Sequence, residues 1–139
     1  MRYYFGTYQS KWQYGYCGAT KQAEGIEEDK YYDAYVTWDP SNQIVVLNGE
    51  TIITNNTATD TTSDNTFALF GRHQGNAFNP SWLSKSKIYY CKIYTGTTIV
   101  RDYIPVIRNS DNKPGMWDRV SKTFFTNGGS GDDFTYESL

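Results

Sequence analysis

Hydrophobic and polar residues alternate with a period of two along most of the chain, which is the pattern of half-buried β-strands. Over residues 31–38 this alternation would place four side chains on one face: Tyr32, Ala34, Val36 and Trp38. The clearest local pattern spans 43–53, where two apolar runs flank Asn48-Gly49. This dipeptide accepts the positive φ angles of a type I′ turn, so a β-hairpin is predicted there.

Further strands are predicted over 66–72, 86–94 and 98–108, with turn-rich connectors between them. Pro105 lies inside the last of these strands and suits an edge strand or a bulge, because proline has no N–H to donate. Residues 21–29 could make one helical turn, but no window of 12 residues keeps a period of 3.6. Short strands at this spacing predict an all-β fold, either an antiparallel sandwich or a barrel.

The composition is rich in aromatic residues, which make up 17% of the chain and include 13 tyrosines, while only 38% of residues are hydrophobic. Tyrosine suits strands with one wet face, and it also suits surfaces that bind ligands. Trp38 is expected in the core, whereas Trp12 and Trp82 lie beside loops and are expected at the surface. A chain of 139 residues is long enough for one core, so a single domain over 1–139 is predicted.

The charge pattern limits the classes of partner that the protein is expected to bind. A formal net charge of −2 without a stripe of lysine or arginine argues against a nucleic-acid partner. The chain has no signal-peptide core and no run of 18 apolar residues, so no membrane partner is expected. If the protein acts outside a cell, we expect it to leave by lysis or within a longer chain or particle.

Few residues suggest catalysis. His73 is the one histidine and no G-x-S-x-G motif occurs, so no nucleophilic triad is expected. Glu27 and Asp29 have the i, i+2 spacing that a glycosidase pair could use on a strand, but their segment has the composition of a solvated loop. Asp102 lies between apolar residues and is expected to be either buried and paired or on an edge strand.

Metal binding has little support. Cys91 falls in a predicted strand and is expected to be a buried free thiol, and two distant cysteines with one histidine do not form a zinc pattern. Three segments carry Asp and Asn that suit calcium and turns equally well: 63–67, 109–115 and 128–133. Calcium therefore stays open as a ligand, and no other cofactor is expected.

The remaining signal is a set of aromatic and polar side chains that suits recognition. The predicted ligand-binding residues are Tyr8, Trp12, Tyr14, Arg72, His73, Asn76 and Trp82. Flat rings stack on the C–H faces of sugars, while amide and guanidinium groups hydrogen-bond to hydroxyls. The same residue types also suit a protein interface.

The end of the chain resembles a known family. The strands "KIYYCKIY" and "IVRDYIPVIR" and the closing motif "GMWDRVSKTFFTNGGSG" are similar, in that order, to the C-terminal half of LamG-like, concanavalin A-like domains. Such domains occur in tail and capsid-appendage proteins of bacteriophages and in related proteins of gut bacteria. The earlier "VVLNGE" hairpin and the strand "TFALFGR" fit the same order, so the resemblance covers roughly 30–135.

The resemblance implies an antiparallel β-sandwich of the jelly-roll type, with the closing motif as scaffold. In that reading Gly115 relaxes into a turn, residues 116–117 enter a strand and Asp118 caps or bridges locally. Residues 124–125 would place one ring in the core and one at its rim, and the glycines of 128–131 would form the last turn.

Two departures from the family pattern change the expectation. Family members usually begin with an extra strand or two, so we expect this chain to be either a shortened version or a fragment of a longer protein. If strands are missing, one edge of the sandwich is left exposed or is filled by a partner chain. Glucanases of the same fold carry E-x-D-x-x-E, and Tyr32 stands where the last glutamate would be. Inherited hydrolase activity is therefore not expected.

These observations support a non-enzymatic binding domain of a phage appendage or surface protein that recognises a host cell-surface glycan. The alternative is a structural module of a virion or surface particle, whose partner is a neighbouring subunit or a second copy of the chain. A glycan hydrolase that uses Glu27 and Asp29 is the least favoured reading. Either of the first two readings places the protein on a virion or a cell surface.

Overall fold

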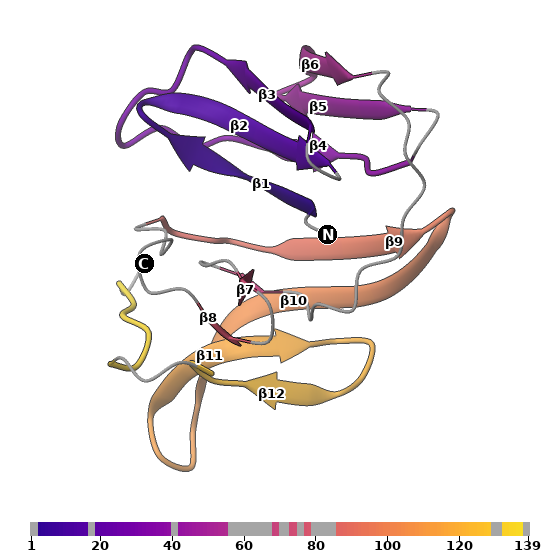
Figure 1. The fold of residues 1–139 in the computed structure, drawn as a ribbon. Coiled ribbons are helices and arrows are strands. Elements are labelled where there is room, and N and C mark those ends of the chain that lie inside the picture. The colour runs from indigo at the N-terminus through magenta and orange to yellow at the C-terminus, as the bar shows by residue number, and fades with distance from the viewer. Residues whose placement is uncertain are drawn as a thin grey trace. The chain divides into compact units, whose positions relative to one another are not determined.

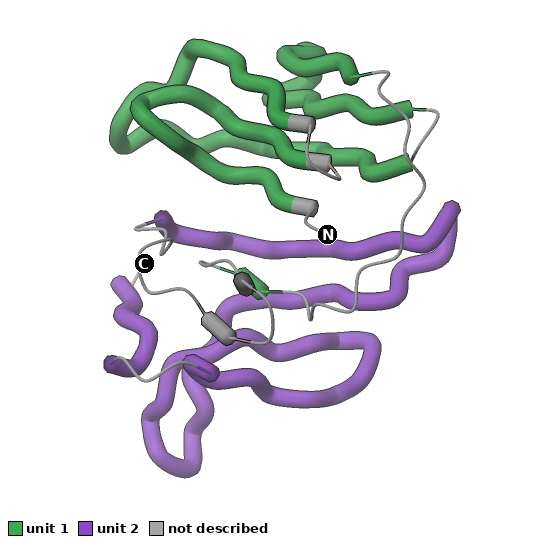
Figure 2. Tube along the Cα trace, in the orientation of Figure 1, with its two compact units in different colours: residues 1–85 green, residues 86–139 purple. Residues whose placement is uncertain are grey.

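The structure is a computed structural model that describes residues 3–16, 19–39, 42–55, 68–69, 73–74, 77–78, 86–128 and 132–137. Within these ranges every strand pairs antiparallel and no helix occurs, so the predicted all-β class is confirmed. No helix in the described ranges is therefore long and apolar enough to cross a membrane. The chain divides into two compact units, 1–85 and 86–139 (Figure 2). The single domain over the whole chain stays a prediction.

Unit 1 contains two three-stranded sheets and a two-stranded ribbon (Figure 1). The first sheet has the order β1-β2-β3 and consists of β1 (Tyr3–Tyr8), β2 (Lys11–Tyr16) and β3 (Ala19–Ala23). The second has the order β4-β5-β6 and consists of β4 (Ala34–Val36), β5 (Gln43–Leu47) and β6 (Glu50–Asn55). The ribbon joins β7 (His73–Gln74) to β8 (Ala77–Phe78). The predicted strand 66–72 falls almost wholly outside the described residues.

Residues 21–29 do not form the helical turn that their sequence would allow. Residues 21–23 instead complete β3, where Lys21 pairs with Tyr14 of β2. Pairing with β2 gives this backbone hydrogen-bond partners on a neighbouring strand. An isolated helical turn is less stable, because it fixes several residues for a single hydrogen bond. The residues after β3 continue as an irregular loop to β4.

The core of unit 1 lies between its two sheets. Tyr14 from β2 and Val45, Leu47 and Ile53 from β5 and β6 form one buried cluster. The Tyr14 hydroxyl donates to the backbone oxygen of Thr37 at 2.8 Å, which satisfies the one polar atom of this buried side chain. Trp38 stacks on Tyr14 with ring centroids 6.4 Å apart but remains 37% exposed, so its predicted core position is wrong. It lies two residues beyond the end of β4.

The predicted hairpin is confirmed, and its turn has φ angles of 50° at Asn48 and 86° at Gly49. The register shifts after Val45, which faces Ile53, so that Ile52 is an extra residue in β6. Because of this bulge, Ile52 and Ile53 both pack on the core although they are consecutive. A strict alternation would have turned one of them to solvent.

Unit 2 is a four-stranded antiparallel sheet with the order β12-β11-β10-β9. Its strands are β9 (Cys91–Thr95), β10 (Thr98–Arg108), β11 (Lys113–Asp118) and β12 (Thr123–Phe125). The strand predicted over 98–108 is confirmed, whereas the one predicted over 86–94 begins only at Cys91. β9 pairs with β10 no further than Tyr103, so Pro105 lies in an edge portion of β10, as predicted.

A buried carboxylate holds the turn between β11 and β12. Asp118 is completely buried, and its Oδ1 accepts hydrogen bonds from the backbone N–H groups of Asp102 and Val120, each at 3.0 Å. Its Oδ2 accepts the Ser121 hydroxyl at 2.7 Å and lies 3.6 Å from Arg101 Nε. Burial acts to raise the pKa of Asp118, but these hydrogen bonds outweigh it and lower the pKa to about 2. The predicted capping role of Asp118 is therefore confirmed.

Asp102 on β10 is buried and paired, which is the first of its two predicted states. Arg119 donates to Asp102 Oδ2 from Nε at 2.9 Å and from Nη2 at 2.7 Å, and the Arg119 backbone N–H donates to the Asp102 carbonyl. The two carboxylates thus tie the β11–β12 turn to β10. The stretch 116–125, although dense in charges and rings, is scaffold in this structure.

Gly115 does not form the turn that was expected of it. It lies inside β11, opposite Val106, and a Cβ atom there would be 2.5 Å from Phe124 Cζ and 2.5 Å from the Phe125 carbonyl oxygen. Glycine is needed because the strand passes directly beneath a ring of β12. Of the glycines at 128–131, only Gly128 is described, and it has no regular structure.

Candidate functional site

The seven predicted ligand-binding residues do not form one site in the described structure. Tyr8 ends β1 and is 41% exposed, whereas Tyr14 is completely buried in the core. Tyr14 is therefore not part of the exposed surface that was expected, because its ring packs between the two sheets. Arg72, Asn76 and Trp82 lie outside the described residues, and only the backbone of His73 is described, in β7.

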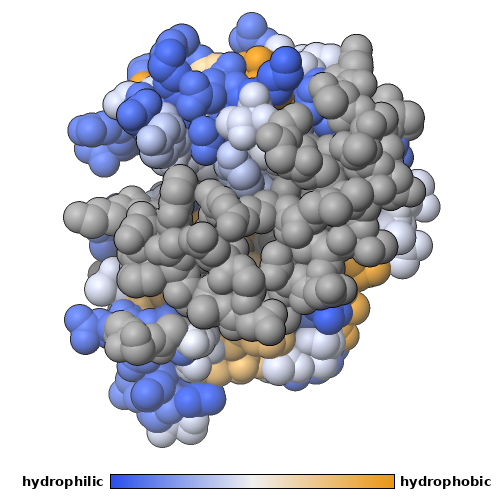
Figure 3. Space-filling view, viewed as in Figure 1, coloured by the Kyte–Doolittle hydropathy of each residue, from blue (hydrophilic) through white to orange (hydrophobic). Residues whose placement is uncertain are grey.

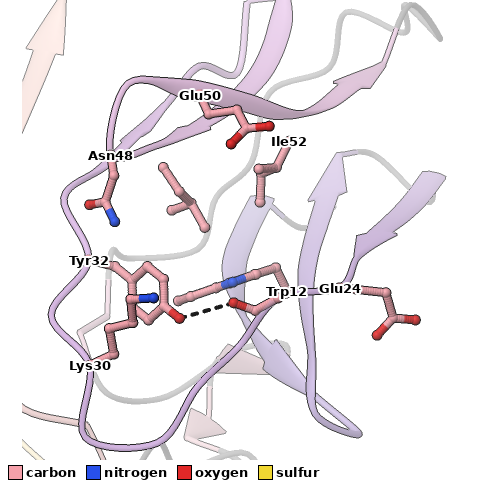
Figure 4. Close-up of a pocket in the computed structure, with 9 residues that line it drawn as sticks. Trp12, Glu24, Lys30, Tyr32, Asn48, Glu50 and Ile52 are labelled. Carbon is pink, nitrogen blue, oxygen red and sulfur yellow. Dashed lines mark hydrogen bonds between the residues drawn. The ribbon is translucent and has the colours of Figure 1, made fainter.

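Of the predicted residues that the structure describes, Trp12 lines a pocket whose lining residues all belong to unit 1. Its volume is about 340 Å³, which is at the lower end of the usual range for small-molecule sites. Three segments form it: β2, the loop from β3 to β4, and the β5–β6 hairpin. The lining residues are Trp12, Glu24, Gly25, Lys30, Tyr32, Leu47, Asn48, Glu50 and Ile52 (Figure 4).

Two aromatic rings give the pocket a rigid wall. Trp12 stacks on Phe5 with centroids 5.4 Å apart and meets the edge of Tyr32 at 5.0 Å and 76°. The Tyr32 hydroxyl donates to the Gly25 carbonyl and accepts the backbone N–H of Glu27, both at 3.0 Å. Tyr32 is thereby fixed at both ends, so its ring is presented in one orientation.

The hairpin turn forms another side of the pocket and is joined to the loop before β4. The backbone N–H of Asn48 donates to the Asp33 carbonyl at 2.8 Å, and the Asn48 side-chain oxygen accepts the Asp33 N–H at 2.8 Å. This leaves the amide nitrogen of Asn48 as a donor. In Figure 4 the Asn48 amide, the Tyr32 ring and the Glu50 carboxylate lie around the same space.

Most charged groups of the pocket are already paired. Lys30 Nζ lies 2.6 Å from Glu27 Oε1 and 5.9 Å from the centre of the Tyr32 ring, and its hydrogen bond to Glu27 raises the pKa of Lys30. Glu24 forms an ion pair with Lys11 at 2.6 Å. Glu50 makes no hydrogen bond or ion pair within the described part of the chain.

One polar atom of the aromatic wall is unsatisfied. The indole Nε1 of Trp12 is buried and has no acceptor among the described residues. A buried N–H without a partner costs about 1–3 kcal/mol. A ligand oxygen that reached it would recover this free energy, whereas Leu47 and Ile52 supply only apolar contact.

Taken together, the pocket offers two rings, two aliphatic side chains, an amide donor and a free carboxylate. This set can hold a small polar molecule that has an apolar face. Glu27 and Asp29, the carboxylates considered for hydrolysis, do not share a strand, since Asp29 has φ of 57° in the loop and Glu27 is paired with Lys30. Within the described ranges no cluster of three metal-ligating side chains occurs, and of the segments considered for calcium, 63–67 lies outside them.

Sequence reasoning missed most of the lining. Tyr32 was assigned to a strand face, Glu24 and Lys30 to a solvated loop, and Asn48 only to a turn. The alternation of hydrophobic and polar residues does not reveal that the loop from β3 to β4 meets the β5–β6 hairpin. The resemblance directed the functional prediction to aromatic loops, whereas this pocket is formed by β2, the loop from β3 to β4 and the β5–β6 hairpin.

Comparisons with known proteins find no relative of this chain. No protein-family model matches the chain, no curated protein matches it, and no solved structure matches its fold.

Proposed function

We propose that this chain is a non-enzymatic carbohydrate-binding domain and that the unit 1 pocket is its ligand site. The observation that carries the proposal is the fixed pair of rings, Trp12 and Tyr32, beside the donor of Asn48 and the acceptor of Glu50. A pyranose has apolar C–H faces and a rim of hydroxyls. Rings against the faces and polar groups against the rim are what holds such a ligand in a shallow pocket.

The rigidity of the pocket favours binding. The Tyr32 hydroxyl has two backbone partners, and the Asn48 turn is joined to Asp33 by two hydrogen bonds. Little side-chain freedom is left to lose when a ligand arrives, which is a main cost of association. The groups that would contact a sugar are therefore arranged before it binds.

A glycan array followed by calorimetric titration tests this proposal. Asn48→Gly keeps a residue suited to positive φ while it removes the amide, and it should weaken binding of any array hit. Asn112→Gly is the matched control, since Asn112 has φ of 55° in the turn between β10 and β11 and lies in unit 2. Equal affinities of the two variants would place the sugar elsewhere, and an array without hits would reject the proposal.

The ring contact can be tested separately. Tyr32→Ala should cost roughly 1–3 kcal/mol of binding free energy, by the scale of aromatic stacking on nucleobases. Tyr35→Ala is its control, because Tyr35 is a 59% exposed tyrosine that does not line the pocket. Circular dichroism of both variants would show that the sheets remain folded.

The finer fold assignment belongs to the same proposal. We infer a concanavalin A-like jelly roll, of the kind found in phage appendages and surface proteins, from the order of the strands in the C-terminal half. β9, β10, β11 and β12 follow one another as the resemblance requires, with β10 at 98–108. An experimental structure of the purified chain with a different strand order would overturn the assignment.

A second function, assembly with a neighbouring subunit or a second copy, is favoured by the surface of unit 2. Its described residues include exposed apolar side chains, among them the cross-strand pair Tyr94 and Ile99, which are 48% and 39% exposed. Apolar colour is visible among the described residues of unit 2, whereas the described surface of unit 1 in this view is mostly hydrophilic (Figure 3). Sedimentation velocity over a range of concentrations separates the functions, because a chain that stays monomeric throughout does not self-assemble.

A further inference from the structure

The pocket holds one negative charge that no described residue of unit 1 neutralises. Around it, Glu24 is paired with Lys11 and Lys30 is paired with Glu27, so these four charges cancel. Glu50 makes no ion pair or hydrogen bond with any residue that the structure describes. The net charge of the pocket is therefore negative and equals that of one carboxylate, Glu50. This residue lies at the start of β6, beside the hairpin turn.

The position of this carboxylate relative to the rings gives it a chemical preference. In the view of Figure 4, Glu50 lies at one end of the pocket and the Trp12 and Tyr32 rings at the other, with Ile52 between them. A carboxylate together with aromatic faces is the combination that binds an ammonium group, through an ion pair on one side and cation–π contact on the other. Lys30 Nζ, which is paired with Glu27, lies 5.9 Å from the centre of the Tyr32 ring.

We propose that the pocket selects sugars that carry a free amine, with Glu50 as the residue that recognises the ammonium. This inference rests on the proposed function, because it names the sugar class that the same pocket takes. The pyranose ring lies against Trp12 and Tyr32, and the Asn48 amide donates to a ring hydroxyl. The protonated amine meets Glu50, which is the specificity-determining contact.

N-acetylation provides a matched pair of ligands. Glucosamine hexamers and N-acetylglucosamine hexamers share the same backbone and differ in the charge on nitrogen. In mildly acidic buffer of low ionic strength, the full chain should bind the amine form about five- to thirtyfold more tightly, as expected for a hydrogen-bonded ion pair. Added salt should reduce this preference, because it screens a partly exposed pair.

Two variants assign the preference to Glu50. Glu50→Gln keeps the shape of the side chain and should bring the two hexamers to nearly equal affinity. Glu28→Gln is the control, since Glu28 is an exposed glutamate of the neighbouring loop that does not line the pocket. It should leave the preference unchanged. Both positions are exposed, so neither substitution should unfold the chain.

The outcomes separate the inference from the proposed function. If both hexamers bind equally and Asn48→Gly weakens both, the pocket binds sugar but does not select an amine, and only this inference fails. If neither hexamer nor any arrayed glycan binds, the proposed function fails as well. Binding of a lysine-rich peptide without binding of the glucosamine hexamer would also overturn the inference, because the carboxylate would then serve a protein ligand.

Discussion

Gly115 offers the sharpest test of the fold, because the structure leaves no room for a single added carbon. In Gly115→Ala the new Cβ would lie 2.5 Å from Phe124 Cζ and 2.5 Å from the Phe125 carbonyl oxygen. Favourable contact between carbon atoms begins at about 3.5 Å, so the atom is roughly 1 Å too close on two sides. The Phe124 ring could tilt, but the carbonyl belongs to the β12 backbone, which pairs with β11 through Met116 and Phe125.

Relief of this clash requires β12 to move away from β11. The movement would also separate the Phe124 ring from Arg108, whose guanidinium carbon lies 4.6 Å from the ring centre. Overpacking of this kind costs about 1–3 kcal/mol. We expect Gly115→Ala to lie at the upper end of that range, because one of its two obstructions is backbone.

Gly6→Ala is the matched control. Gly6 also lies in a strand, β1, but nothing lies within 4 Å of where its Cβ would be. Alanine is favoured over glycine inside a strand by about 0.5–1 kcal/mol, so this variant should be neutral or slightly more stable. The two substitutions therefore make the same chemical change with opposite expected signs.

Hydrogen exchange measured by mass spectrometry reads each unit separately, which a global unfolding curve of a two-unit chain does not. Peptides from 113–125 should lose protection in Gly115→Ala, whereas peptides from 3–16 should keep it in Gly6→Ala. Equal protection of β11 and β12 in Gly115→Ala and in the parent chain would refute the close passage of β12 over Gly115.

Three further results are expected. Tyr14→Phe removes the buried hydroxyl that donates to Thr37 and should lower the free energy of opening of unit 1 by about 0.5–1.5 kcal/mol, measured by hydrogen exchange of its peptides. The Asp118 carboxyl has a pKa of about 2 in the folded chain against an ordinary 3.8, so its ionised form stabilises unit 2 above about pH 4 and this contribution is lost as the pH falls toward 2. Circular dichroism across this range should show acid unfolding that is shallower in Asp118→Asn. Burial raises the pKa of the Cys91 thiol to about 11, so alkylation of the Cys91 peptide at neutral pH should be slow until urea unfolds the chain.

The parts of the fold that could be predicted are those that local chemistry decides. The hairpin over 43–53 follows from Asn48-Gly49, whose positive φ angles are built into the residue types. The strand at 98–108 follows from a long apolar and β-branched run, and Pro105 was placed at an edge by its missing N–H. None of these features needs knowledge of a distant residue.

The parts that could not be predicted depend on contacts between segments. The loop between β3 and β4 has a polar composition typical of solvent exposure, yet Tyr32 anchors it through Gly25 and Glu27. The pocket exists because this loop meets the Asn48 turn at Asp33, 15 residues away along the chain. A pattern read along the chain does not contain that encounter, so Glu50 and Tyr32 did not stand out as ligand residues.

Glycine beneath an aromatic ring explains how a chain with only 38% hydrophobic residues covers its sheets. In unit 1 the Tyr4 ring of β1 lies over Gly15 of β2, where it leaves no room for a Cβ atom, and in unit 2 the Phe124 ring lies over Gly115. A bare glycine in a strand exposes backbone and costs stability, but a ring laid across it excludes water and contacts the strand directly. The tyrosine hydroxyl still reaches a polar partner, as Tyr4 does with Thr20 at 3.1 Å. The aromatic content that suggested a recognition surface is therefore used in part to cover strands, and Tyr32 itself packs against the core while it also lines the pocket.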